Sequence, residues 1–175
     1  MLKMTKLINP TAELADSYRA LVSEFTSAGE HLTPFPLSFP NDDMAELIHK
    51  LEEASNGIGI FDKFAPNSTY WLVHDNEVVG VSNLRHYLTD RLRQKGGHIG
   101  YGVRPSARRR GFGADILRFT LEKARDLGIT EALITCDKGN LGSVGVILAN
   151  GGVLESGVPH PENDATIQRY WISLA

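Results

Sequence analysis

The hydrophobic and polar positions of this chain follow two different periods, and the period changes near the middle. Apolar residues recur at helical spacing over residues 11–25 and again over residues 41–51. Gly29 and the pair Asn56-Gly57 follow these stretches as helix stops. In the middle of the chain, short runs rich in β-branched and aromatic residues flank Asp75-Asn76-Glu77, which is a hairpin signal. The pattern therefore predicts two helices followed by a strand-rich region.

The whole chain predicts the order β-α-α-β-β-β-α-β-α-β-β, which is typical of an α/β domain with a mixed sheet and helices on its faces. The expected strands are 2–8, 69–74, 78–84, 98–103, 132–136, 153–156 and 166–174. The expected helices are 11–25, 41–55, a short one within 89–97, 111–127 and 142–150. Asn41 is the expected N-cap of the second helix, and three prolines at positions 34, 36 and 40 exclude regular structure before it.

Composition narrows the class of protein without identifying its function. The chain has 175 residues, of which 42% are hydrophobic and 22% charged, as expected for one globular domain. Its net charge of −3 excludes a global basic field for nucleic acid, and it slightly favours a small or cationic partner. Cys136 is the only cysteine, so no intrachain disulfide is possible. Because no signal peptide and no membrane-spanning run is evident, we expect a cytoplasmic location.

The segment HIGYGVRPSARRRGFGADIL carries the clearest chemical signal. A strand ends at Val103, Pro105 interrupts it, and Gly111-Phe112-Gly113 open a helix after three arginines. Such a loop directs several backbone N–H groups to the positive end of a helix, and its glycines let a phosphate approach closely. A dinucleotide fingerprint does not fit, because Ile116 occupies the third glycine position, and the Gly-Lys-Ser/Thr ending of a P-loop is missing. The alternatives are a nucleic-acid patch and a solvated charge run.

The same segment resembles motif A of the GNAT N-acetyltransferases, through Arg108-x-x-Gly111-x-Gly113 after Val103-x-Pro105. The similarity continues through the strand ALITC to Asn140-x-x-Ser143 and Asn150-Gly151, and the chain is similar to a bacterial branch of this superfamily. The resemblance implies a single domain over residues 1–175, with a mixed, mostly antiparallel sheet and helices on both faces. It also implies that strands 98–103 and 132–136 splay apart and leave a slot between them.

The resemblance further implies an enzyme that uses acetyl-CoA as co-substrate, without a metal, and transfers the acetyl group to a primary amine of a small molecule or peptide. Backbone groups of Tyr101, Gly102 and Val103 would then contact the pantetheine arm and the acetyl carbonyl. Asn140 would reach the pantetheine, with Ser143 one turn beyond. The loop that would wrap the pyrophosphate comprises Arg108, Arg109, Arg110, Gly111, Phe112, Gly113 and Ala114.

The catalytic groups are less well defined, because Ile147 stands where many family members have a tyrosine acid. Ser143 is the first candidate for the acid and Tyr170 the second. His98 is the candidate base, with a buried structural histidine as the alternative. The other side chains considered are His86 as a base, Glu30 and His31 at the acceptor site, and Cys136, which is expected to be a buried structural thiol rather than a nucleophile.

Three further possibilities stay open. A non-catalytic acyl-CoA sensor would keep the glycine loop and lack the acid and base. A nucleic-acid-binding module would show steeply salt-dependent binding. The last strand, 166–174, also allows a homodimer edge. The histidines show no metal-ligand spacing, so we expect no metal. The net charge and the lack of a long apolar run lead us to expect neither nucleic acid nor a membrane as a partner.

Overall fold

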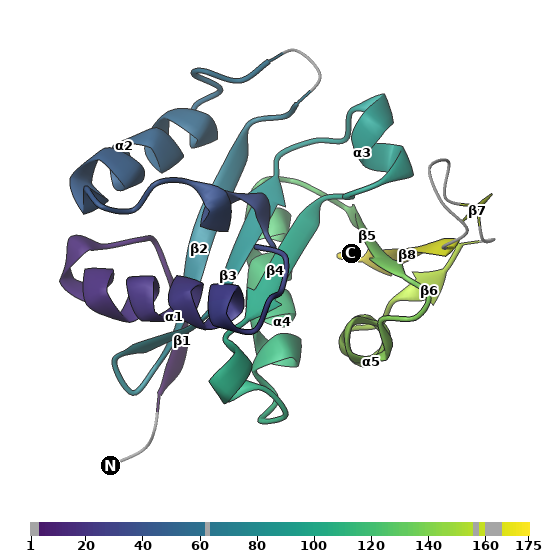
Figure 1. Ribbon diagram of the computed structural model, residues 1–175. Coiled ribbons are helices and arrows are strands. Elements are labelled where there is room, and N and C mark those ends of the chain that lie inside the picture. Colours follow the sequence, from purple (N-terminus) through teal and green to yellow (C-terminus); the bar gives the residue numbers. More distant parts are fainter. Residues whose placement is uncertain (1–3, 62–63, 156–157, 160–165) are drawn as a thin grey trace.

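The computed structural model describes residues 4–61, 64–155, 158–159 and 166–175, which form two antiparallel sheets and the helices around them (Figure 1). The first sheet has the order β1-β2-β3-β4 and the second has the order β5-β8-β6, with β7 also paired to β8. The strands are β1 (Thr5–Ile8), β2 (Asn67–His74), β3 (Glu77–Arg85), β4 (Ile99–Val103), β5 (Glu131–Asp137), β6 (Val153–Leu154), β7 (Val158–Pro159) and β8 (Thr166–Ser173).

Helices cover both faces of the first sheet, and one helix lies against the second. In Figure 1, α1 and α2 lie on one face of the first sheet, where α1 packs on β3 and α2 on β2, α4 lies behind β3 and β4, and α5 lies beside the second sheet. The α-helices are α1 (Ala15–Ser27), α2 (Met44–Ser55), α3 (Asp90–Gln94), α4 (Phe112–Asp126) and α5 (Leu141–Ala149). Within the described residues the 3-10 helices are η1 (Ala12–Leu14) before α1, η2 (Phe35–Ser38) between α1 and α2, and η3 (Pro105–Ala107) between β4 and α4. The predicted α/β class, with mostly antiparallel strands and helices on both faces, is confirmed.

The helical periodicity of the first region marks the residues that pack on the sheet. Tyr18, Leu21 and Phe25 of α1 are buried, and the Tyr18 ring stacks on Trp71 of β2 with the ring centroids 4.6 Å apart. On the opposite face, Ile116 is one of several fully buried α4 residues. These two layers hold α1 and α4 on opposite sides of β4. The C-terminal end of α1 and the N-terminal end of α4 therefore meet at the same cleft.

Two local expectations were wrong. The proline-rich segment contains η2 (Phe35–Ser38), because a proline near the first position of a helical turn loses no hydrogen bond. The N-cap of α2 is Asp43 rather than Asn41, since the Asp43 carboxylate accepts a hydrogen bond from Glu46 N at 3.1 Å. Asn41 instead accepts from Arg19 Nε through its backbone carbonyl, at 2.9 Å. Of the predicted first strand, Leu2 and Lys3 lie outside the described residues.

The two sheets meet at His98 and then diverge. His98 N donates to Leu133 O at 2.7 Å, and Leu133 N donates to His98 Nδ1 at 2.9 Å. A Cβ on Gly97 would collide with the Leu133 carbonyl, so a side chain is excluded at this approach. Beyond this point β4 and β5 belong to different sheets, and the predicted splay of the central strands is confirmed.

The junction also makes the stability of the fold sensitive to acid. Burial, with a smaller contribution from Arg93 and Arg85, lowers the pKa of His98 from near 6.5 to about 4. Because the folded pKa lies below the unfolded one, the unfolded chain binds more protons between these values, and stability falls as the pH falls through this range. We expect the free energy of unfolding to drop by about 2 kcal/mol between pH 7 and pH 5 on this account. Denaturant titrations at both pH values measure it.

His98→Asn provides the matched variant, because an asparagine oxygen can accept from Leu133 N without titrating. This variant should lose most of the decrease in stability between pH 7 and pH 5. His49→Asn, at an exposed position of α2, should retain it. A decrease that is equal in wild type and His98→Asn would contradict the assignment.

Candidate functional site

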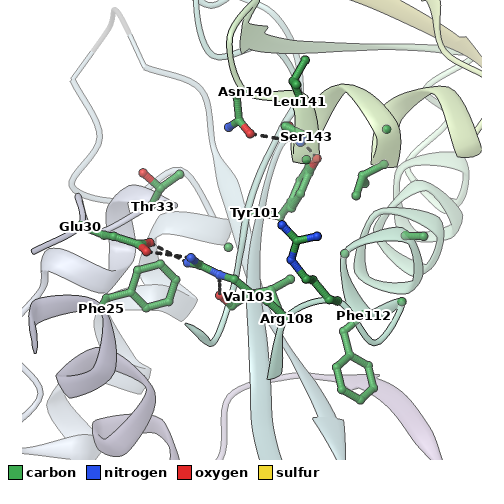
Figure 2. Close-up of a pocket in the computed structure, with 18 of the residues that line it drawn as sticks. Phe25, Glu30, Thr33, Tyr101, Val103, Arg108, Phe112, Asn140, Leu141 and Ser143 are labelled. Carbon is green, nitrogen blue, oxygen red and sulfur yellow. Dashed lines mark hydrogen bonds and ion pairs between the residues drawn. The ribbon is translucent and has the colours of Figure 1, made fainter. Parts of the chain in front are cut away.

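A cleft of about 1130 Å³ opens where β4 and β5 diverge (Figure 2). Its walls are the end of α1 with the loop after it, the open edge of β4, the start of α4 and one face of α5. The lining residues predicted for the cofactor are Tyr101, Gly102, Val103, Arg108, Arg109, Gly111, Phe112, Gly113, Ala114, Asn140 and Ser143. Arg110 and His98 do not line it.

The start of α4 has the geometry of an anion-binding helix end. Arg109 and Gly111 have positive φ values of 60° and 86°, so the loop turns back on itself before the helix. No side chain caps the helix at Gly111, and Asp115 N donates to Gly111 O as the first helical bond. The backbone N–H groups of the first turn, residues 112–114, therefore lack intrahelical partners and point to the cleft. This arrangement provides several donors and a positive dipole end for a phosphate group.

The open edge of β4 supplies backbone groups to the same cleft. Just before β4, Arg85 N donates to His98 O, and just after it, Arg104 N donates to Val79 O. The same register makes the even-numbered residues between them the ones whose backbone groups bond to β3. In an antiparallel pair the bonded positions alternate, which directs the N–H and C=O groups of Tyr101 and Val103 away from β3. The strand therefore presents donors and acceptors to an extended ligand lying between β4 and β5.

Gly102 does not present backbone groups to the cleft as expected, and its importance is steric. Its backbone groups face β3, and an added Cβ would collide with the Thr33 carbonyl and lie 3.2 Å from Phe25 Cζ. The loop after α1 therefore crosses directly over β4. Gly113 similarly allows α5 to approach α4, since a Cβ there would lie 2.9 Å from Val146 Cγ2.

The Arg108 side chain points to the loop after α1, away from the start of α4. It forms a bidentate ion pair with Glu30, with Nη1 2.7 Å and Nη2 2.6 Å from the carboxylate oxygens, and its Nε donates to Val103 O at 3.1 Å (Figure 2). The hydrogen bonds from Arg108 lower the pKa of Glu30. Arg110 lies over the Phe112 ring. Of the three arginine side chains, Arg109 is the one that lines the cleft and has no such contact with the described residues. A phosphate in the cleft would therefore meet the Arg109 side chain and the backbone of the loop.

Two hydroxyl groups meet at the α5 wall. The Tyr101 hydroxyl lies 2.8 Å from Ser143 Oγ, and Ser143 N donates to Asn140 Oδ1 at 3.1 Å, so Asn140 caps α5 (Figure 2). Burial raises the pKa of Tyr101 to about 12, although the bond to Ser143 acts in the opposite direction. The phenol is therefore protonated at neutral pH and is a proton donor facing the cleft.

Several candidates from the sequence lie elsewhere. His98 is 6% exposed and uses Nδ1 as an acceptor in the strand junction. The His86 ring bonds to Ser68 Oγ at 2.8 Å on β2, and the Tyr170 hydroxyl donates to Gln168. Ile147 is fully buried in the core of the second sheet, where it packs as an apolar residue. None of these four side chains lines the cleft.

Part of the cleft wall was not predicted from the sequence. The missed residues are Phe25, Gly29, Thr33, Leu141, Gly142, Gly145, Val146 and Ala149. Four of them share one face of α5, because Gly142, Gly145, Val146 and Ala149 recur at spacings of three and four. This stripe of small residues was a visible signal for a helix face that a ligand approaches closely.

Within the described part of the chain, no cluster of three or more metal-ligating side chains is present. Among the described helices, none is long and apolar enough to cross a membrane.

Solved structures with the same fold are numerous. An acetyltransferase from Salmonella typhimurium that modifies the N-terminal serine of ribosomal protein L7/L12 matches with a TM-score of 0.70 at 16% identity, over 98% of this chain and 95% of that chain. The microcin C7 self-immunity acetyltransferase MccE, in complex with acetyl-CoA and AMP, matches with a TM-score of 0.68 at 15% identity, over 97% and 92%. YncA, a putative acetyltransferase from Salmonella typhimurium with its cofactor acetyl-CoA, matches with a TM-score of 0.63 at 12% identity, over 98% and 94%.

No curated protein matches the sequence. The sequence model of the acetyltransferase (GNAT) family, in contrast, matches residues 29–151, which is more than half of the chain and contains nearly the whole cleft. The glycine loop, the splayed strands and this match agree, and the chain therefore belongs to the GNAT family of acetyltransferases.

Proposed function

We propose that this protein is an acetyl-CoA-dependent N-acetyltransferase that moves the acetyl group directly to a primary amine. One observation carries the proposal above all others: the uncapped start of α4 and the open edge of β4 face the same cleft. The first suits a pyrophosphate and the second suits an amide-containing arm. Acetyl-CoA bears both, with a thioester at the end of the arm.

The residues present fit this co-substrate. Backbone N–H groups of residues 109–114 would hold the pyrophosphate, and the open space around Gly111, where an added Cβ meets nothing within 4 Å, leaves room for it. Each charge-assisted hydrogen bond contributes about 1.5–3 kcal/mol, so three or four of them suffice for useful affinity. Tyr101 and Val103 would bond the arm, and a Val103 or Tyr101 N–H would stabilise negative charge on the thioester oxygen.

Tyr101 is the proposed general acid. As the amine nitrogen bonds to the acetyl carbon and the carbon–sulfur bond breaks, the Tyr101 hydroxyl donates its proton to the leaving sulfur. The nitrogen gives up one proton to a base, so the products are an amide and a free thiol, and proton exchange with water then restores the Tyr101 hydroxyl and the base. Ser143, the acid candidate from sequence, would orient the Tyr101 hydroxyl through the 2.8 Å bond.

The acceptor side of the cleft offers one candidate base. Glu30 is held by Arg108, which lowers its pKa and makes it a weak proton acceptor. His31 is the only imidazole among the described lining residues, and we assign it to proton removal from the acceptor amine. His98 is left out of this role, because its acceptor nitrogen is occupied.

The neighbours support an amine acceptor without identifying it. The Salmonella acetyltransferase modifies an N-terminal serine, and MccE is a self-immunity acetyltransferase. The acceptor of this chain is proposed to be a small molecule or peptide amine.

An acyl-CoA sensor is the alternative, and the Tyr101–Ser143 pair argues against it. A sensor has no use for a paired hydroxyl in the cleft wall, whereas transfer can use the Tyr101 hydroxyl to protonate the leaving sulfur.

Calorimetric titration of the purified protein with acetyl-CoA tests the proposal. We expect 1:1 binding in the micromolar range, followed by thiol release when amines are supplied. Binding without thiol release over a broad amine panel would favour the sensor, and the absence of binding to folded protein would reject both.

A further inference from the structure

Arg85, at the end of β3, is a mostly buried cation beside the acceptor side of the cleft. Its Nη1 donates to Gly96 O at 3.1 Å. Across β4, a Cβ on Gly100 would lie 3.3 Å from Nη1 and 3.4 Å from Nη2, and 3.5 Å from Pro34 Cβ. Gly100 therefore provides the space in which the guanidinium lies, between β4 and the loop after α1.

No carboxylate neutralises this guanidinium among the residues that the structure describes. The contrast with nearby arginines is clear, since Arg104 pairs with Glu24 at 2.7 Å and Arg108 pairs with Glu30 at 2.6 Å. Burial lowers the pKa of Arg85 to about 10, so the group stays charged at neutral pH. A mostly buried charge ordinarily has a counter-ion, because desolvation of an unpaired ion is costly. One carbonyl contact leaves most of the five guanidinium N–H donors available.

The position of Arg85 relates it to the transfer point. Gly100 and Gly102 lie on the same face of β4, and Gly102 lines the cleft. Two residues along a strand span roughly 7 Å, so Gly100, beside which the guanidinium lies, is about that far along β4 from Gly102 in the cleft wall. An acceptor whose amine reaches the open edge of β4 there would extend along the strand toward Arg85.

A second cation and an aromatic ring lie near Arg85, outside the residues that line the cleft. Arg93 of α3 acts on His98 electrostatically together with Arg85, which places both charges near the strand junction. The Phe35 ring is 6.0 Å from Arg85 Cζ and is 43% exposed. The local charge is thus positive, although the whole chain carries −3. This local positive charge disfavours a cationic partner, although the net charge of the chain favours one.

We propose that Arg85 binds an anionic oxygen group, a carboxylate or a phosphate, on the acceptor, so that the substrate class is an amine that also bears an acidic group. Arg93 adds positive potential at the same end, and Phe35 forms an apolar wall. This inference rests on the proposed function for its substrate role, while the anion-binding site itself can be tested separately.

The first test compares matched amines in the transfer assay. One pair is 5-aminopentanoate and 5-aminopentanol, and the other is phosphoethanolamine and ethanolamine, which separate the carboxylate from the phosphate. We expect kcat/KM for the acidic member of at least one pair to exceed that of its neutral partner by on the order of ten- to a hundred-fold, the effect of one charge-assisted bond. Arg85→Gln should abolish this preference mainly through KM, and Arg85→Lys should restore part of it.

The second test measures binding without transfer. The two acidic amines are titrated into wild type, Arg85→Gln and the matched control Arg118→Gln, whose guanidinium is exposed and paired on α4. Loss of binding in Arg85→Gln alone, with unchanged thermal stability and acetyl-CoA affinity, supports the site. Equal rates for acidic and neutral amines in wild type, or equal binding in wild type and Arg85→Gln, overturns it. A wild type that binds the acids and not acetyl-CoA would instead reject the proposed function and keep the anion site.

Discussion

Gly111→Trp should lose at least roughly 100-fold in affinity for acetyl-CoA, which corresponds to two lost charge-assisted bonds at the start of α4. The position suits a blocking side chain, because an added Cβ meets nothing within 4 Å and the indole would therefore project into the space left for the pyrophosphate. Calorimetric titration of the folded variant measures the loss.

Gly128→Trp is the matched control for this variant. Gly128 follows α4 at its other end, has a φ of 82° against 86° for Gly111, and is equally open around an added Cβ. The two substitutions thus carry the same backbone strain, and only one of them fills the cleft. If both variants bound acetyl-CoA as wild type does, the pyrophosphate site would not be at the start of α4. If both lost binding, strain rather than blocking would be the cause.

Tyr101→Phe should lower kcat by roughly 100-fold, the lower range of a general acid, and leave the affinity for acetyl-CoA unchanged. The substitution removes the hydroxyl that faces Ser143 and keeps the ring that packs in the cleft. Steady-state kinetics with the best amine, together with calorimetry, separates the two effects.

Two variants show whether the hydroxyl itself is responsible. Ser143→Ala should have a smaller effect of the same kind, because it removes only the partner that orients the Tyr101 hydroxyl. Tyr87→Phe, at an exposed position outside the cleft, should have none. A kcat for Tyr101→Phe equal to that of wild type would assign the acid elsewhere, or leave the thiolate to depart unaided.

The sequence predicted those parts of the site that depend on local geometry. Glycines and a helix start sit close together in the chain, so the loop before α4 was visible from residues 108–114 alone. The strand junction was visible only in part. His98 could be assigned to a strand, but the acceptance of the Leu133 N–H by its ring depends on how two sheets meet, and no local pattern encodes that.

Pairings between distant segments were not predictable. Arg108 was expected to face a phosphate, yet its partner Glu30 lies 78 positions away in the chain. The Tyr101 side chain likewise depends on Ser143, 42 positions later. The small residues on α5 could have been recognised from their spacing, because a helix face without bulk is a local property.

The Arg108–Glu30 pair has a consequence for how two ligands affect each other. Arg108 belongs to the loop before α4, and Glu30 belongs to the loop that crosses β4 on the acceptor side. Arg104 and Glu24 join the same two regions a second time. A ligand that displaces one of these regions therefore strains or breaks the ion pairs that hold it to the other. By thermodynamic reciprocity, whatever factor acetyl-CoA contributes to the affinity for the acceptor, the acceptor contributes to the affinity for acetyl-CoA.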